Sequence, residues 1–119
     1  MNAIKAMLVA SALVSLAGCA STAADFRKTT PVLDLKSSRP AHDVAVCIDD
    51  QWSDVLNGFV MRQTPEGESI VFVANGLIYY LADVNNVSGG GSETKYWVGT
   101  FTFSHYINKL GKAVKSCQD

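Results

Sequence analysis

Three cysteines and two histidines are the side chains best suited to chemistry in this sequence of 119 residues. A zinc site needs about four converging nitrogen or sulfur ligands, and His42 and His105 belong to no HxH or HExxH motif. Ser104 precedes His105, but a nucleophile needs a base and an orienting acid that meet it in space, and no GxSxG motif surrounds this serine. We therefore predict no catalytic residue, no metal site and no cofactor, and we interpret both histidines as surface residues.

Three further patterns resemble binding motifs only superficially. Residues 89–95 combine three glycines with a lysine, but a phosphate-binding P-loop reads GxxxxGK and then Ser or Thr at the start of a helix. These glycines precede a predicted strand, which favours a flexible hairpin loop. The acidic group Asp49, Asp50 and Asp54 lacks the ligand spacing of a calcium loop and is interpreted as a solvated helix face. The lysines at positions 109, 112 and 115 are interpreted in the same way, with contact to anionic lipid or peptidoglycan as the alternative.

The first nineteen residues predict export and lipidation. Lys5 and the α-amine give a positive start, and the apolar run over residues 6–16 is typical of a secretory signal, too short to span a bilayer comfortably. The exit Leu16-Ala17-Gly18-Cys19 resembles the lipobox of bacterial lipoprotein precursors. The resemblance implies that residues 1–18 are cleaved, that the Cys19 thiol carries diacylglycerol, and that its amine takes a further acyl chain such as palmitate. The alternative is an ordinary secretory signal in which Cys19 is incidental.

Lipidation would determine where the protein is located. Each buried methylene is worth about 0.8 kcal/mol, so two or three acyl chains hold a protein on a membrane essentially permanently. Ala20 follows Cys19, whereas Asp at this position tends to retain lipoproteins in the inner membrane. The resemblance therefore implies the outer membrane, with the protein facing the periplasm, over the inner membrane.

The two remaining cysteines are predicted to pair. Lipidation of Cys19 would leave Cys47 and Cys117, and an oxidising periplasm favours a disulfide between them. Closing a loop of roughly 70 residues would stabilise the fold by about 4 kcal/mol in the chain-entropy model. Free buried thiols and a redox pair are the alternatives, but no CxxC spacing supports the second.

Length and charge exclude several classes of protein. The chain is long enough for one small domain only, and its aromatic fraction of 9% with only 3 prolines argues against a wholly disordered chain. It has 11 acidic and 10 basic residues, which create no basic field that could hold nucleic acid. We therefore predict no nucleic-acid partner.

Residues 19–42 are predicted to be the lipidated cysteine and a flexible tether, and residues 43–119 a small domain. The tether is polar and without sustained periodicity, although Val32-Leu33-Asp34-Leu35 could form a short strand. An apolar stripe predicts a helix that begins at an Asp43 N-cap and stops at Asn57-Gly58. A second stripe predicts a helix over residues 104–115, capped by Ser104, and the disulfide would make the two helices antiparallel.

Between these helices, alternating and β-branched runs predict three to four strands. Asn75-Gly76 between two such runs is typical of a type I′ hairpin turn, and a regular two-residue turn would place Phe72 opposite Tyr79. The predicted fold is α+β: an antiparallel sheet flanked by an N-terminal and a C-terminal helix on one face, in the order α-β-β-β-β-α. The candidate strands are residues 59–64, 69–74, 77–84 and 95–103.

The remaining sheet face is the candidate interaction surface, formed by Tyr80 with Tyr96 or Trp97. The alternative is that the tether folds over these aromatic side chains. The spacing of Cys47 and Trp52, the segments Leu81-Ala82-Asp83-Val84 and Gly91-Ser92, and the terminal Cys117 resemble small uncharacterised proteobacterial lipoproteins. That resemblance carries no known activity.

We predict a non-enzymatic binding module of the cell envelope, whose partner is an envelope protein or polymer. A homodimer formed through the sheet is a further option. The alternative function is a prophage-type exclusion factor or an inhibitor of an envelope enzyme, which would insert a protruding loop over residues 85–94. A small hydrolase would be a third interpretation, but the chain lacks a recognisable catalytic set.

Overall fold

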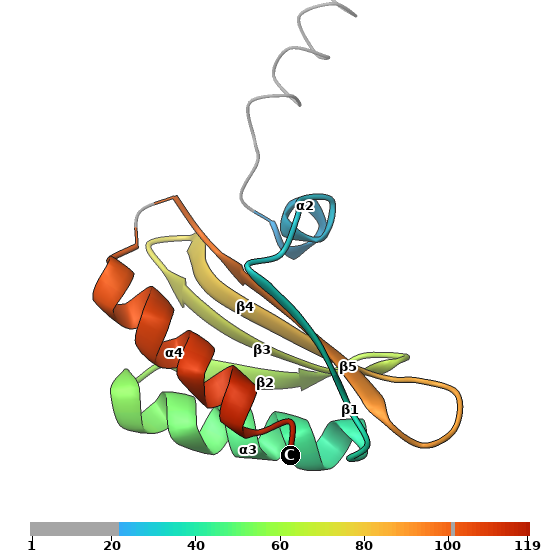
Figure 1. Ribbon diagram of the computed structural model, residues 1–119. Coiled ribbons are helices and arrows are strands. Elements are labelled where there is room, and N and C mark those ends of the chain that lie inside the picture. The colour runs from blue at the N-terminus through green and yellow to red at the C-terminus, as the bar shows by residue number, and fades with distance from the viewer. Residues whose placement is uncertain (1–21, 101) are drawn as a thin grey trace, which may run out of the picture.

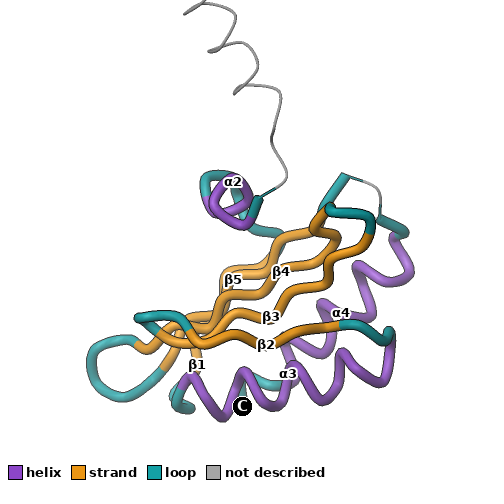
Figure 2. The backbone as a smooth tube through the Cα atoms, turned by 180° about the vertical axis from the view of Figure 1, so that it is seen from behind, coloured by secondary structure: helices purple, strands orange, loops and turns teal. Residues whose placement is uncertain are grey.

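The structure is a computed structural model that describes residues 22–100 and 102–119. A five-stranded antiparallel sheet has the strand order β1-β5-β4-β3-β2. Two longer helices lie on one face of this sheet, and a short helix lies over the other face near one end (Figures 1 and 2). The elements are α2 (Ala23–Arg27), β1 (Leu33–Ser37), α3 (Ala41–Val55), β2 (Phe59–Gln63), β3 (Gly67–Ala74), β4 (Leu77–Asn86), β5 (Ser92–Val98) and α4 (Ser104–Ser116).

The α+β fold class is confirmed, with α3 and α4 on one face of an antiparallel sheet. The predicted signal sequence, the lipobox and Cys19 lie outside the described residues. Among the helices of residues 22–100 and 102–119, none combines the length and the apolar character needed to cross a bilayer.

The fifth strand comes from the segment predicted to be a flexible tether. Residues 33–37 form β1, where Leu33 pairs with Tyr96 and Leu35 with Thr94 of β5. The strand alternates half-buried and exposed residues, so its leucines face the core and its charged residues face water. The tether prediction for residues 19–42 is therefore wrong over α2, β1 and the start of α3, and the alternative of a short strand near Val32–Leu35 is confirmed. The pairing partner of β1 lies about sixty residues away in the sequence, and a five-residue strand is too short to show a period by itself.

The helix ends differ slightly from their prediction. Helix α3 begins at Ala41 with Pro40 at the N-cap, ahead of the expected Asp43 cap, and the Val44 amide donates to the Pro40 carbonyl at 3.2 Å in the first turn. Helix α4 has Phe103 rather than Ser104 at its N-cap. Helix α3 ends at Val55 with an extended Leu56 at its C-cap, just before the predicted stop at Asn57-Gly58, where Gly58 has a φ of +111°.

The core lies between the helices and the sheet and is centred on Trp52. This side chain is fully buried, and its indole nitrogen donates a hydrogen bond to the Leu110 carbonyl of α4 at 3.0 Å. Its ring packs against Phe59 of β2 and Tyr96 of β5, with centroids 4.9 Å and 5.5 Å away. One residue therefore joins α3, α4 and two strands of the sheet.

The β3–β4 turn has the predicted conformation, but the register beyond it shifts. Asn75 and Gly76 have φ values of +53° and +74°, as a type I′ turn requires, and Val73 pairs with Ile78. A β-bulge then makes Phe72 pair with Tyr80, so the predicted pairing of Phe72 with Tyr79 is wrong.

The bulge decides which side chains of β4 face the helices. It puts Tyr80 and Ala82 on the helix side, opposite Phe72 and Ile70, and leaves Leu81 on the other side, opposite Val71. A single extra residue therefore reverses the faces that a regular hairpin would give to the rest of β4.

The predicted loop over residues 85–94 is shorter than expected. Strand β4 continues to Asn86 and β5 begins at Ser92, because these two residues still pair. The connection is residues 87–91, and β5 ends at Val98 instead of continuing to residue 103.

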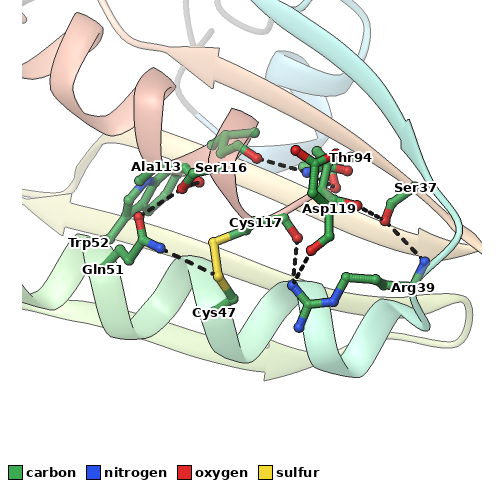
Figure 3. The surroundings of a disulfide bond; sticks show 12 residues. Ser37, Arg39, Cys47, Gln51, Trp52, Thr94, Ala113, Ser116, Cys117 and Asp119 are labelled. Carbon is green, nitrogen blue, oxygen red and sulfur yellow. Dashed lines mark hydrogen bonds between the residues drawn. A yellow bond between two sulfur atoms is a disulfide. The ribbon is translucent and has the colours of Figure 1, made fainter.

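The predicted disulfide between Cys47 and Cys117 is present (Figure 3). It joins the N-terminal half of α3 to the residue that caps the C-terminus of α4, and the two helices run antiparallel as expected. Around it, Gln51 donates to the Cys47 sulfur at 3.5 Å, and the Ser116 hydroxyl donates to the Gln51 side-chain carbonyl at 3.1 Å.

The C-terminal end is also tied to the connection between β1 and α3. The Arg39 guanidinium donates a hydrogen bond to the Cys117 carbonyl at 2.9 Å (Figure 3). The Ser37 hydroxyl donates a hydrogen bond to the Gln118 carbonyl. The cross-link therefore stabilises a junction of three elements: β1, α3 and α4.

Replacing both cysteines in Cys47→Ala/Cys117→Ala should lower the free energy of unfolding by up to about 4 kcal/mol, because the cross-link closes a long loop of the unfolded chain. Urea unfolding of the oxidised protein and the double variant measures this difference. Reductant should lower the unfolding midpoint of the natural sequence and leave the double variant unchanged. Equal midpoints for the two proteins would contradict a stabilising role.

Candidate functional site

The sheet face opposite α3 and α4, which we call the α2 face, buries a small apolar cluster. Val71, Leu81 and Trp97 lie on three neighbouring strands, and each is no more than 8% exposed. Ala23 and Phe26 of α2 pack against this cluster, together with Ile78 of β4. Helix α2 is therefore packed on the sheet (Figure 2).

The predicted interaction surface of Tyr80, Tyr96 and Trp97 is wrong. The three side chains are 3%, 0% and 4% exposed, and they do not share a face of the sheet. Tyr80 and Tyr96 belong to the core under the helices, where the Tyr96 hydroxyl donates to the Ile107 carbonyl at 3.2 Å. Burial raises the pKa of the Tyr96 phenol, so this group stays neutral.

Trp97 lies on the α2 face, and the supposed tether covers it. Its indole nitrogen donates to the Thr29 carbonyl at 3.1 Å, just after α2 ends, and its ring belongs to the cluster that Phe26 packs against. The apolar cluster on the α2 face would be exposed to water without further contacts. The chain that precedes β1 buries it, through Ala23 and Phe26.

A polar site adjoins this cluster on the same face. Arg27, the last residue of α2, donates from Nε to Asp83 Oδ2 at 2.6 Å and from Nη2 to Asp83 Oδ1 at 3.0 Å. Ser69 pairs with Asp83 across β3 and β4 and donates from its hydroxyl to Oδ1 at 2.6 Å. The hydroxyl oxygen in turn accepts from Arg27 Nη2 at 3.1 Å. We call Arg27, Ser69 and Asp83 the clasp.

The geometry of the clasp suits the attachment of α2 to the sheet better than it suits catalysis. Both Asp83 oxygens already accept hydrogen bonds, and the bidentate guanidinium neutralises the charge that a general base would use. The hydrogen bonds from Arg27 to Asp83 raise the pKa of the guanidinium, which therefore stays charged. Asp83 is only 7% exposed, and a buried carboxylate is costly without hydrogen-bonding partners such as Arg27 and Ser69.

An open hollow of about 300 Å³ adjoins the clasp. Its walls come from α2, from the β2–β3 turn and from β3 and β4, and its lining within the described residues is without aromatic side chains. The hollow is lined by Arg27, Thr64, Pro65, Glu66, Ser69, Asp83 and Asn85.

The two histidines lie apart. His42, in the first turn of α3, contacts Glu68 of β3, with 2.6 Å between Nδ1 and Oε1, and its side chain is 68% exposed. The hydrogen bond and the charge of Glu68 raise the pKa of His42. His105 is exposed on α4 and packs edge-on against Tyr106. Within residues 22–100 and 102–119, no three His, Cys, Asp or Glu residues converge as metal ligands would.

One member of the clasp, Asp83, has a signal in the sequence. It is a charged residue inside the apolar run Leu81-Ala82-Asp83-Val84, and a buried carboxylate needs a cationic or hydrogen-bonding partner. The pattern could have identified Asp83 but not Arg27, which lies 56 residues earlier on a five-residue helix.

Comparisons with protein-family models, with curated proteins and with solved structures find no match for this chain. Its function is therefore inferred from the residues and their arrangement alone.

Replacing Arg27 in Arg27→Met should release α2, because the buried Asp83 would lose its charged partner. We expect the free energy of unfolding to fall by about 1–3 kcal/mol, and trypsin to cut faster after Lys28. Urea unfolding and limited proteolysis measure these effects. Arg62→Met removes an exposed arginine from β2 and is the matched control. Unchanged cleavage after Lys28 in the Arg27 variant would show that the clasp does not hold α2.

The contact between His42 and Glu68 should make stability depend on pH. Because the pKa of His42 is raised in the folded state, its contribution is complete below the ordinary histidine pKa of about 6.5 and is lost as the pH rises through the raised value. The urea midpoint of the natural sequence should therefore fall between mildly acidic and mildly alkaline pH. His42→Gln should reduce that fall, and His105→Gln should retain it. Identical profiles for the natural sequence and the His42 variant would contradict this interpretation.

Proposed function

We propose that the mature protein is a lipid-anchored lipoprotein of the cell envelope that binds another envelope protein and catalyses no reaction. The lipobox-like Leu16-Ala17-Gly18-Cys19 supports the anchor, and Ala20 favours the outer membrane. The observation that carries the proposal is the disulfide, because Cys47 and Cys117 are the two cysteines that lipidation of Cys19 would leave. Structural disulfides persist in oxidising compartments such as the periplasm.

The edge strand β2 is the surface that best fits a protein partner. It is the last strand in the sheet order, so one side of its backbone faces no other strand among the described residues. Val60 is 49% exposed and Met61 is 37% exposed, and these residues belong to opposite faces of the strand. An extended segment of a partner could add to this edge through main-chain hydrogen bonds, with the apolar side chains giving selectivity.

The other edge is less suited to this role. Strand β1 exposes Asp34 and Lys36, and alternating charges on an edge strand oppose pairing with another chain. Strand β2 begins instead with three apolar residues, Phe59-Val60-Met61. We therefore assign the partner to β2, in place of the aromatic surface expected from the sequence.

The anchor is tested by Cys19→Ser. Removing the thiol that would carry the lipid should move the protein from the membrane fraction to the soluble periplasmic fraction, measured by fractionation and immunoblotting. The Cys47→Ala/Cys117→Ala variant, which keeps Cys19, should remain with membranes and serves as the control. Unchanged fractionation of the Cys19 variant would refute lipid anchoring.

The binding edge is tested by a photo-crosslinking benzophenone amino acid in place of Val60. In living cells we expect one discrete adduct with a different envelope protein, identified by mass spectrometry. Val46 is similarly exposed, at 43%, but lies on α3, so the same probe there should not give this adduct. No adduct at position 60, or an adduct between two copies of the chain, would contradict the proposed partner.

A further inference from the structure

The exposed apolar side chains include a group at the end of the molecule where the chain enters α2. Phe103 is 74% exposed, Val73 is 49% exposed and Leu77 is 36% exposed. Val73 lies near the end of β3 and Leu77 begins β4, so both flank the turn between these strands, and Phe103 lies in the connection between β5 and α4. This turn and this connection lie at the same end of the sheet as α2 (Figures 1 and 2). We call these three residues the apolar tip.

Hydrogen bonds and packing hold these segments together. The amide of Gly99 donates to the Tyr79 carbonyl at 2.7 Å, which ties the end of β5 to the β3–β4 hairpin. Ile78 in the same hairpin packs into the cluster that Ala23 and Phe26 of α2 also contact. The tip and α2 are therefore fixed relative to each other.

The site of the proposed lipid lies close to this end. Cys19 precedes Thr22, the first described residue and the N-cap of α2, by only three positions in the sequence. An extended chain spans at most about 3.6 Å per residue, so Cys19 is no more than roughly 11 Å from Thr22. Since the clasp and the cluster hold α2 on the sheet, an acylated Cys19 would keep this end of the domain at the bilayer surface.

We propose that the apolar tip inserts into the interfacial region of the bilayer that carries the Cys19 lipid. This inference rests on the proposed lipid anchor and adds a defined orientation to it. Apolar and aromatic side chains are favoured at this depth, and Lys28, exposed at the end of α2, could face the lipid headgroups. Strand β2 and α3 lie at the side of the molecule farthest from α2, so this orientation would leave the β2 edge accessible from the periplasm (Figure 1).

The orientation is tested by quenching of an introduced tryptophan by brominated lipid. The full-length, lipidated Phe103→Trp variant is purified from membranes and reconstituted in phosphatidylethanolamine and phosphatidylglycerol vesicles, with and without bromine on the acyl chains. We expect a marked loss of the added emission in brominated vesicles. The natural tryptophans, Trp52 and Trp97, are 0% and 4% exposed and supply a constant background.

Val87→Trp is the matched control, because Val87 is 39% exposed in the β4–β5 connection at the other end of the sheet. Its added emission should be the same in both kinds of vesicle. Val73→Trp is a second reporter from the tip and should be quenched like the Phe103 variant.

Equal quenching at the two ends, or no quenching of either tip variant in acylated protein, would overturn the inference while leaving the anchor intact. Palmitate labelling of the same preparations separates the two proposals. Protein that incorporates no palmitate would overturn the anchor and, with it, the membrane orientation of the tip. A tip covered by a second copy of the chain would also overturn the inference, and would appear as a dimer whose tip variants are protected in both kinds of vesicle.

Discussion

The cross-link between Cys47 and Cys117 is the constraint on which the other contacts of this small domain depend. It fixes α4 antiparallel to α3, and that arrangement brings the Leu110 carbonyl to the indole of Trp52. Trp52 in turn packs against rings from β2 and β5, so the helix layer and the sheet are joined at one buried side chain. Without the covalent bond, the same contacts would have to compensate for the full conformational entropy of a chain with a small core.

The second constraint acts on the opposite face of the sheet. Arg27 and Asp83 form a bidentate pair beside an apolar cluster, and Trp97 donates to the Thr29 carbonyl. Together they make α2 part of the domain, and the proposed lipid would be separated from the fold by only a few residues. A lipid so close to α2 would keep this end of the domain near the bilayer, which is why the structure bears on the proposed orientation as well as on the proposed location.

Much of this architecture could be predicted from local patterns. The apolar stripes around Ile48 and Val114 identify α3 and α4, and Asn75-Gly76 identifies the β3–β4 turn, because these signals depend on residues close together in the sequence. The pairing of Cys47 with Cys117 followed from the count of cysteines and the expected compartment, and the structure confirms it.

The remaining features depend on distant residues or on a single extra residue. Strand β1 exists because β5 offers an edge, and α2 is held by Asp83 and Trp97, which no short segment near residue 27 could indicate. The bulge beside Tyr80 exchanges the two faces of β4, which places Tyr80 in the core under the helices. Trp97 is covered by the chain that precedes β1, which was the alternative to an open aromatic surface. The clasp as a whole could not be predicted from any one segment, because its three residues come from α2, β3 and β4.

Intact mass spectrometry of the protein extracted from membranes under non-reducing conditions is the most direct test of a lipid-anchored, oxidised envelope protein. The expected mass is that of residues 19–119 with two or three acyl chains and two hydrogens fewer for the Cys47–Cys117 bond. A mass that retains residues 1–18, or one with an unmodified Cys19 thiol, would contradict the central claim.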